Sequence, residues 1–100
     1  MPPPTRIRLP AEVADLIRSL HPQIKRKIRC ALDEILQNPA SGKQLRGDLA
    51  GYRSFRVGRI RIIFRQAGQI LEIVAIGRRE IVYLETAQLL RRLNPAVPQR

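Results

Sequence analysis

Several residue types that support common protein chemistries are scarce in this 100-residue chain. Cys30 is the only cysteine, so no disulfide can form within the chain. Because there is also only one histidine, His21, the cysteine and histidine ligand sets of structural zinc sites are excluded. Aromatic residues make up 4% of the chain, so the core has to consist of aliphatic side chains. We expect neither a metal nor a cofactor.

Long apolar runs are missing as well. The longest span only a few residues, which argues against a membrane-spanning helix, and the start Met1-Pro2-Pro3-Pro4 lacks the hydrophobic region of a secretory signal. We therefore expect a cytoplasmic protein with no membrane partner. The length fits one domain over residues 1–100, with flexible ends at 1–4 and 95–100.

Negative charge is the third scarcity. Eight acidic residues stand against 19 lysines and arginines, which gives a formal charge of +11. This is more than solubility requires, and it destabilises the compact state through self-repulsion. The balance predicts an anionic partner.

The first half of the chain has the pattern of one strand and two helices. Residues 5–9 alternate polar and apolar side chains between prolines, which is typical of an edge strand. From Pro10 the spacing becomes helical, and His21-Pro22 ends one helix and starts the next, which Asn38-Pro39 ends. The two apolar stripes are Val13, Leu16, Ile17 and Leu20, then Ile24, Ile28, Ala31, Leu32, Ile35 and Leu36. The pattern predicts an αα-hairpin.

The second half favours β structure. Residues 39–51 are expected to form a loop anchored by Leu45 and Leu49. Runs rich in β-branched residues then indicate an antiparallel meander over residues 52–57, 60–66 and 69–76, with turns at Gly58-Arg59 and Ala67-Gly68. Residues 77–80 break the last strand, 81–83 form a short extended piece, and 84–93 form a final helix. This order predicts an α+β fold: an N-terminal strand and an αα-hairpin packed on an antiparallel meander, with a short C-terminal helix.

The Gly58 hairpin sets which side chains share a face. A two-residue turn pairs Val57 with Ile60 and Arg56 with Arg61, so the arginines point away from the apolar face. Like charges directly opposite each other destabilise an antiparallel pair, and an anion between them would relieve the repulsion.

Basic residues are concentrated around this hairpin. Guanidinium groups bind phosphate oxygens in bidentate fashion, so a phosphate-bearing polyanion is the expected ligand, although charge alone does not distinguish DNA from RNA. Between residues 43 and 79 there are nine: Lys43, Arg46, Arg53, Arg56, Arg59, Arg61, Arg65, Arg78 and Arg79.

Three segments of the sequence carry a family resemblance. They read K-x-L-x-G from Lys43, G-Y-R-S-F-R-V-G-R-I-R-I-I-F from Gly51, and I-V-A-I-G-R-R-E-I-V-Y ending at Tyr83. The chain resembles the RelE/ParE superfamily of toxins from type II toxin–antitoxin systems and is closer to the RelE branch. The resemblance implies a cognate antitoxin partner, with operator DNA contacted through that antitoxin.

The RelE branch implies a ribosome-dependent mRNA endonuclease, in which the ribose 2′-hydroxyl attacks the adjacent phosphate and translation stops. Its partners would be the ribosome and mRNA. Four residues of this sequence match the catalytic positions: Arg56, Arg61, Arg79 and Tyr83. Six further basic residues are candidates for RNA binding: Lys43, Arg46, Arg53, Arg59, Arg65 and Arg78.

Two alternatives follow from departures from the RelE pattern. Ser54 is neutral where active enzymes often carry lysine, so no general base is identified, and the segment from Gly77 to Tyr83 is short. A ParE-like toxin would inhibit DNA gyrase without cutting RNA, and a degenerate toxin would only bind its antitoxin. His21 is expected to cap a helix rather than transfer protons, and Cys30 to be a small packing residue.

Overall fold

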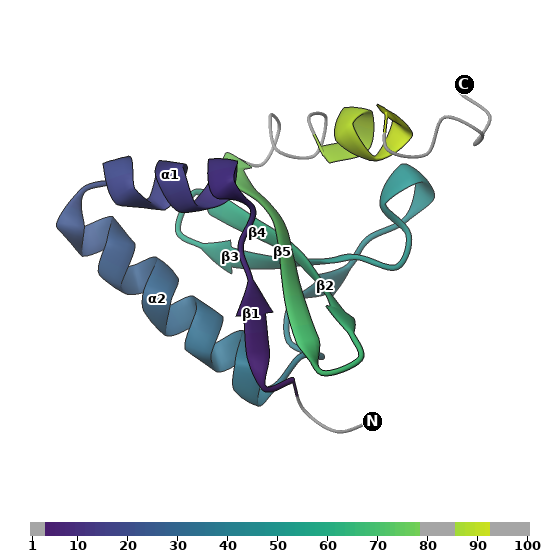
Figure 1. Ribbon diagram of the computed structural model, residues 1–100, viewed down its shortest axis with the longest axis horizontal. Helices are drawn as coiled ribbons and strands as arrows, with labels where there is room; N and C mark the ends of the chain where they lie inside the picture. Colours follow the sequence, from purple (N-terminus) through teal and green to yellow (C-terminus); the bar gives the residue numbers. More distant parts are fainter. Residues whose placement is uncertain (1–3, 79–85, 93–100) are drawn as a thin grey trace.

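A mixed sheet with a helical hairpin on one face forms the framework of the protein (Figure 1). The structure is a computed structural model that describes residues 4–78 and 86–92. Its elements are β1 (Arg6–Arg8), α1 (Ala11–Ser19), α2 (Pro22–Gln37), β2 (Lys43–Gln44), the 3-10 helix η1 (Gly47–Leu49), β3 (Arg53–Val57), β4 (Ile60–Ala67) and β5 (Ile70–Arg78). Residues 86–92 are also helical. This confirms the predicted α+β fold.

The strands lie in the order β1-β5-β4-β3-β2. Neighbours from β5 to β2 pair antiparallel, which confirms the meander, whereas β1 pairs parallel with β5, its Arg6 opposite Ile70. In the described part of the chain, no helix has both the length and the apolar character needed to cross a membrane.

The αα-hairpin forms because the corner between its helices is capped. The Nδ1 atom of His21 accepts a hydrogen bond from the backbone N–H of Gln23 at 3.2 Å, and Pro22 occupies the first turn of α2, where its missing N–H costs nothing. His21 is exposed, as expected for a capping residue.

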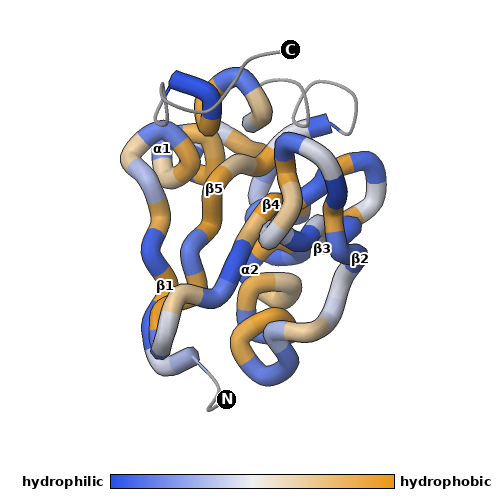
Figure 2. The backbone as a smooth tube through the Cα atoms, turned by 90° about the vertical axis from the view of Figure 1, so that its right-hand side faces the viewer, coloured by the Kyte–Doolittle hydropathy of each residue, from blue (hydrophilic) through white to orange (hydrophobic). Residues whose placement is uncertain are grey.

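The core lies between this hairpin and the sheet. Hydrophobic positions alternate with hydrophilic ones along the chain (Figure 2), and Ile35 of α2 and Phe64 of β4 are fully buried in one apolar cluster. The cluster also contains Val13, Ile28, Ala31, Leu32, Ile62, Leu71, Ile73 and Ile76. Burying a large aliphatic or aromatic side chain contributes about 1.5–3 kcal/mol, so this cluster holds the hairpin on the sheet.

Some element boundaries differ from those expected from the sequence. The second hairpin turns at Gly68-Gln69 rather than Ala67-Gly68, because the residue with positive φ, Gly68 at +62°, takes the first turn position. Strand β5 continues to Arg78 instead of breaking at Gly77. The two-residue strand β2 was expected to be loop.

Five side-chain and segment predictions can also be compared with the structure. Leu16 is 38% exposed although it was placed on the buried stripe, and Cys30 is exposed rather than packed. Pro4, which we expected to be flexible, is buried. The extended piece predicted at 81–83 lies outside the described residues, while residues 86–92 agree with the predicted final helix.

Gly42 fixes the approach of β2 to the sheet. Its φ is +85°, and a Cβ atom at this position would lie 2.6 Å from the carbonyl oxygen of Ser54. Only glycine meets both conditions, because other residues strain at positive φ and would clash with that backbone oxygen.

Candidate functional site

The strand register places three arginines of β3 and β4 on the sheet face opposite the helices, called the outer face below. Arg56 lies opposite Arg61, with Val57 opposite Ile60 and Phe55 opposite Ile62, as the hairpin predicted. Ile62 and Phe64 belong to the core, so Arg61 and Arg65 point the other way.

A β-bulge determines what lies beside Arg61 on its other side. Ile63 pairs with Ala75 but Phe64 pairs with Ile73, so Val74 is an extra residue in β5. The shift brings Gly77 opposite Arg61. Because glycine has no side chain, no β5 side chain lies directly opposite that of Arg61.

The middle of the outer face is not open to solvent. Ser54 and Ile63 lie on this face by register, yet they are only 2% and 0% exposed. An ion pair between Arg91 and Asp48 ties the helical residues 86–92 to η1. Other parts of the chain therefore cover the centre of the face, and its arginines lie toward the two ends.

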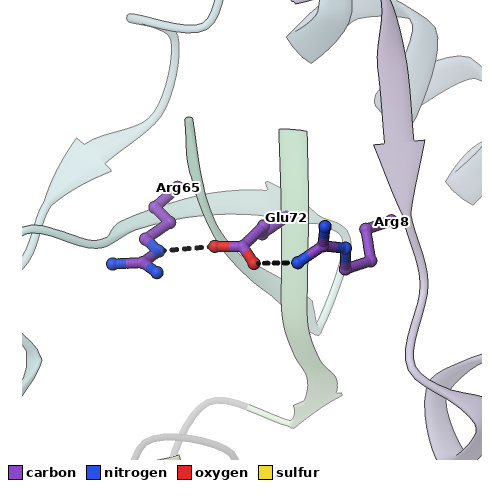
Figure 3. A network of polar contacts seen from close by, with 3 residues as sticks. All are labelled: Arg8, Arg65 and Glu72. Atoms are coloured by element: carbon purple, nitrogen blue, oxygen red, sulfur yellow. Dashed lines mark hydrogen bonds and ion pairs between the residues drawn. The ribbon is translucent and has the colours of Figure 1, made fainter. Parts of the chain in front are cut away.

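At one end, Glu72 holds two arginines from different strands (Figure 3). One Glu72 carboxylate oxygen accepts from Nε of Arg65 at 2.7 Å, and the other accepts from an Nη atom of Arg8 at 2.9 Å. The hydrogen bond to Glu72 raises the pKa of Arg65 above its ordinary value, and the Tyr52 ring lies 5.4 Å from its guanidinium carbon. Arg65 thus has contacts within the protein, and its role in RNA binding stays a prediction.

Arg53 and Arg56 are also engaged by the protein itself. An Nη atom of Arg53 donates to the carbonyl of Ala40 at 3.1 Å, and Arg53 lies opposite Phe64, on the helix side of the sheet. The Nε atom of Arg56 donates to the carbonyl of Gly58 at 3.1 Å, which folds this side chain back along its own hairpin. Arg56 keeps its terminal nitrogens for a ligand, whereas Arg53 does not face the outer surface.

Arg61 differs from these neighbours. It is half-buried, and no described residue forms an ion pair or side-chain hydrogen bond with it. A partly desolvated guanidinium interacts more strongly with an anion than one in water, because the local dielectric is lower. Of the outward arginines of β3 and β4, Arg61 is therefore the one whose guanidinium is not engaged by a described residue.

The remaining predicted site residues are spread around this centre. Lys43 lies opposite Ser54, so it shares the outer face, and Arg46 and Arg59 are exposed in the loop and the turn. Arg78 lies opposite Ile60, which places it on the helix side at the end of β5. Arg79 and Tyr83, two of the four predicted catalytic residues, lie outside the described residues.

Two features of the site were missed in the sequence. One is the role of Glu72. A signal was present in the sequence, because Glu72 is the only acidic residue between residues 52 and 78 and lies opposite Arg65, an outward arginine. The other is the proximity of Arg26 and Lys27 of α2 to Arg56, with which they line one groove. Across residues 4–78 and 86–92, no three His, Cys, Asp or Glu side chains come together as a metal site would require.

Comparison with known proteins places this geometry in a family. A search of curated proteins gave no match. Among solved structures, the chain is similar to the RelBE2 toxin–antitoxin complex from Mycobacterium tuberculosis, with 26% identity, a TM-score of 0.65, and coverage of 76% of this chain and 99% of that one. It also shares the fold of a free-state mutant of the Escherichia coli toxin RelE, at 14% identity and a TM-score of 0.68, over 85% of this chain and 94% of that one.

The family model that matches covers most of the chain. It is that of the ParE toxin of type II toxin–antitoxin systems, and residues 10–83 match it, from the start of the αα-hairpin to Tyr83. The resemblance to the RelE/ParE superfamily is thereby confirmed. The chain belongs to the ParE toxin family of type II toxin–antitoxin systems.

Proposed function

We propose that this toxin is a ribosome-dependent mRNA endonuclease that stops translation. In this proposal, a ribose 2′-hydroxyl of the mRNA attacks the adjacent phosphate, and the mRNA is cut there. The observation that carries the proposal is Arg61, a half-buried arginine that forms no ion pair or side-chain hydrogen bond with a described residue and lies opposite Gly77, which adds no side chain beside it. We further propose that it acts in the cytoplasm and is neutralised by a cognate antitoxin, through which it would contact operator DNA.

The proposed chemistry uses arginine as a fixed positive charge. When the 2′-hydroxyl oxygen attacks, it gives up its proton and bonds to phosphorus while negative charge grows on the phosphate oxygens. The bond from phosphorus to the 5′-oxygen then breaks, and this oxygen takes up a proton, which leaves a 2′,3′-cyclic phosphate and a 5′-hydroxyl end. One well-placed donor to such charge contributes about 3 kcal/mol to transition-state stabilisation. Arg61 would supply this contact, with Arg56 beside it and Arg79 as a further cation. Arginine stays protonated, so none of the three can accept the proton.

Tyr83 has a separate proposed role. Its ring could stack on or orient a nucleotide, and its hydroxyl could join proton transfer where neighbouring cations favour the phenolate. The outer face offers no histidine or carboxylate free for this task among the described residues, because Glu72 is bound between Arg8 and Arg65.

A specific observation favours a second candidate function, inhibition of DNA gyrase. The matching family model is that of ParE, and Ser54, at the position where a basic residue would assist RNA cleavage, is 2% exposed. A buried hydroxyl at this position cannot reach a phosphate. In this alternative the basic surface would bind a protein or DNA and no RNA would be cut.

In vitro cleavage of mRNA on programmed ribosomes tests the first proposal. We expect the native chain to cut mRNA at ribosome-bound codons, and Arg61→Ala and Arg79→Ala each to lower the rate by about 100-fold, the equivalent of one lost donor. Arg65→Ala is the matched control, because Arg65 is held by Glu72, and it should cut at nearly the native rate.

Two results would contradict the endonuclease. One is absence of cleavage by a native chain that binds its antitoxin and is therefore folded. The other is equal loss of activity in Arg61→Ala and Arg65→Ala. Gyrase supercoiling, measured with the same preparation, should be unaffected, and its inhibition would favour the second candidate instead.

A further inference from the structure

A pocket lies between α1, β5 and the helical residues 86–92, which meet at one end of β5 (Figure 1). Strand β1 pairs only with residues 70–72 of β5, and the chain then passes through Leu9 and Pro10 into α1. The edge of β5 beyond Glu72 therefore has no neighbouring strand on that side in the described chain, and the pocket lies along it. Its volume is about 410 Å³, which is within the size range of small-molecule sites.

The walls of the pocket are largely apolar. Leu16 of α1, Val74 of β5 and Leu89 of residues 86–92 contribute to three sides. Val74 is the extra residue of the β-bulge, and Leu16 is one of the two large apolar side chains that are exposed in the described chain. A ligand that covers Leu16 would remove apolar surface from water. The walls therefore favour a ligand with an apolar body.

One buried polar group in the wall lacks a partner. Thr86 lines the pocket and is 1% exposed, and its Oγ1 atom has no hydrogen-bond partner in the described chain. An unpaired buried hydroxyl destabilises a fold, because it has lost its hydrogen bonds to water. Threonine in a helix adopts two rotamers, so rotation about its Cα–Cβ bond can turn Oγ1 toward the pocket. A ligand hydroxyl or carbonyl beside Thr86 would supply the missing partner.

The charged residues of the pocket balance each other. Glu12 of α1 and Arg92 both line it, both are exposed, and neither forms an ion pair among the residues that the structure describes. One negative and one positive charge leave the pocket without net charge, in contrast to the arginines of the outer face. An uncharged molecule also loses less hydration than an ion when it enters apolar surroundings. The pocket therefore favours an uncharged ligand over phosphate or another ion.

We propose that this pocket binds an uncharged, amphipathic small molecule, an aliphatic chain of medium length that ends in one hydroxyl or carbonyl group. The chain would lie against Leu16, Val74 and Leu89, and its polar end would form a hydrogen bond with Thr86. A second copy of this protein does not fit, because two molecules of charge +11 repel each other. Binding requires neither RNA nor cleavage, so the inference stands apart from the proposed endonuclease.

Titration of the full chain with 1-octanol, followed by the methyl resonances in NMR spectra, tests the proposal. We expect saturable binding with a dissociation constant of about 1 mM, an ordinary strength for a ligand of this size. The methyl resonances of Val74 and Leu89 should shift with the same constant. Those of Val57, which lines the groove between α2 and β3, should stay in place.

Variants of the two threonines test the hydrogen bond. Thr86→Val keeps the shape of the side chain without its hydroxyl and should weaken binding about fivefold, whereas Thr86→Ser should bind nearly as well as the native chain. Thr5→Val, the same change on an exposed threonine outside the pocket, should leave binding unaltered. Urea denaturation checks folding. Because the deleted hydroxyl is unpaired, Thr86→Val should be at least as stable as the native chain.

Two further ligands test the proposed chemical class. Octanoate has a chain of the same length but carries a charge, and 1-propanol has the hydroxyl but little apolar surface. Each should bind at least about tenfold more weakly than 1-octanol, because the pocket provides no net charge for the first and the second buries fewer methylene groups.

The outcomes are distinct from those of the cleavage assay. Saturable binding of 1-octanol that Thr86→Val weakens and Thr5→Val preserves supports the pocket, whether or not the native chain cuts mRNA. The proposal is overturned if 1-octanol does not saturate the chain, or if it shifts Val57 instead of Val74 and Leu89. Equal binding to the native chain and to Thr86→Val, or tighter binding of octanoate than of 1-octanol, also overturns it.

Discussion

Replacing Glu72 with glutamine tests how strongly one carboxylate organises the outer face. Glu72 lies on β5 between Arg65 on β4 and Arg8 on β1, opposite both in register, and its own side chain is 19% exposed. Glutamine keeps the shape and one acceptor oxygen but removes the charge. The perturbation therefore isolates the ionic part of the bridge.

The size of the effect follows from the exposure of the three groups. Arg8 and Arg65 are 62% and 46% exposed, so each ion pair is weakened by solvent and contributes about 0.2–1 kcal/mol. Adjacent strands lie about 4.8 Å apart, so the two arginines flank Glu72 at roughly 10 Å from each other. Their mutual repulsion in water adds about 0.4 kcal/mol once the carboxylate is neutral. We expect Glu72→Gln to lower the free energy of unfolding by about 1–2 kcal/mol.

Urea denaturation of the native chain and two variants measures this value. Glu34→Gln is the control for the change in net charge, because Glu34 is exposed and has no ion pair in the described chain. The loss in Glu72→Gln should shrink in high salt, since salt screens exposed charges. The reasoning is refuted if Glu72→Gln and Glu34→Gln unfold at the same urea concentration in low salt.

Three further predictions use other parts of the structure. In Arg61→Ala, the slope of log affinity for single-stranded RNA against log salt concentration should be smaller in magnitude by about 0.7, because one phosphate contact is lost. In Arg65→Ala this slope should be nearly unchanged, and equal slopes in the two variants would contradict the choice of Arg61. Gly42→Ala should lower the free energy of unfolding by more than about 2 kcal/mol, because its Cβ atom would meet a backbone oxygen. Gly47→Ala should lower it by about 1 kcal/mol, because Gly47 also has positive φ but open space around it. Thermal unfolding should therefore show a lower midpoint for Gly42→Ala than for Gly47→Ala. His21→Ala should lose about 1 kcal/mol through its helix cap while His21→Asn keeps most of it, and equal losses in urea would exclude capping as the cause.

The local part of the fold could be predicted from the sequence. The helical stripes, the capped corner at His21 and the Gly58 hairpin depend on contacts between near neighbours, whose spacing the sequence displays directly. The register that places Arg56 opposite Arg61 follows from one glycine and the two-residue turn. The second turn was misplaced by one residue, because the prediction put Ala67 first in the turn and Gly68 second. The first position of this turn has positive φ, which Gly68 adopts and alanine does not favour.

The long-range part could not be predicted. The extra residue Val74 in β5 has no local signal, because a β-branched residue fits a regular strand equally well. The commitment of Arg65 to Glu72 depends on cross-strand register, which the bulge and the second turn both set. The burial of Ser54 depends on segments distant in sequence. Of the catalytic residues that the family resemblance implied, the structure describes Arg56 and Arg61, whose roles stay predictions.

The parallel pairing of β1 with β5 has a consequence for the order in which the protein folds. Arg8 and Glu72 are 64 positions apart in the sequence, so β1 leaves the ribosome long before its partner β5 has been synthesised. Contacts this distant slow folding, because a long loop must close before they form. A nascent chain that ends before β5 has no complete sheet for the αα-hairpin to cover. We therefore expect the domain to fold only after synthesis has passed β5.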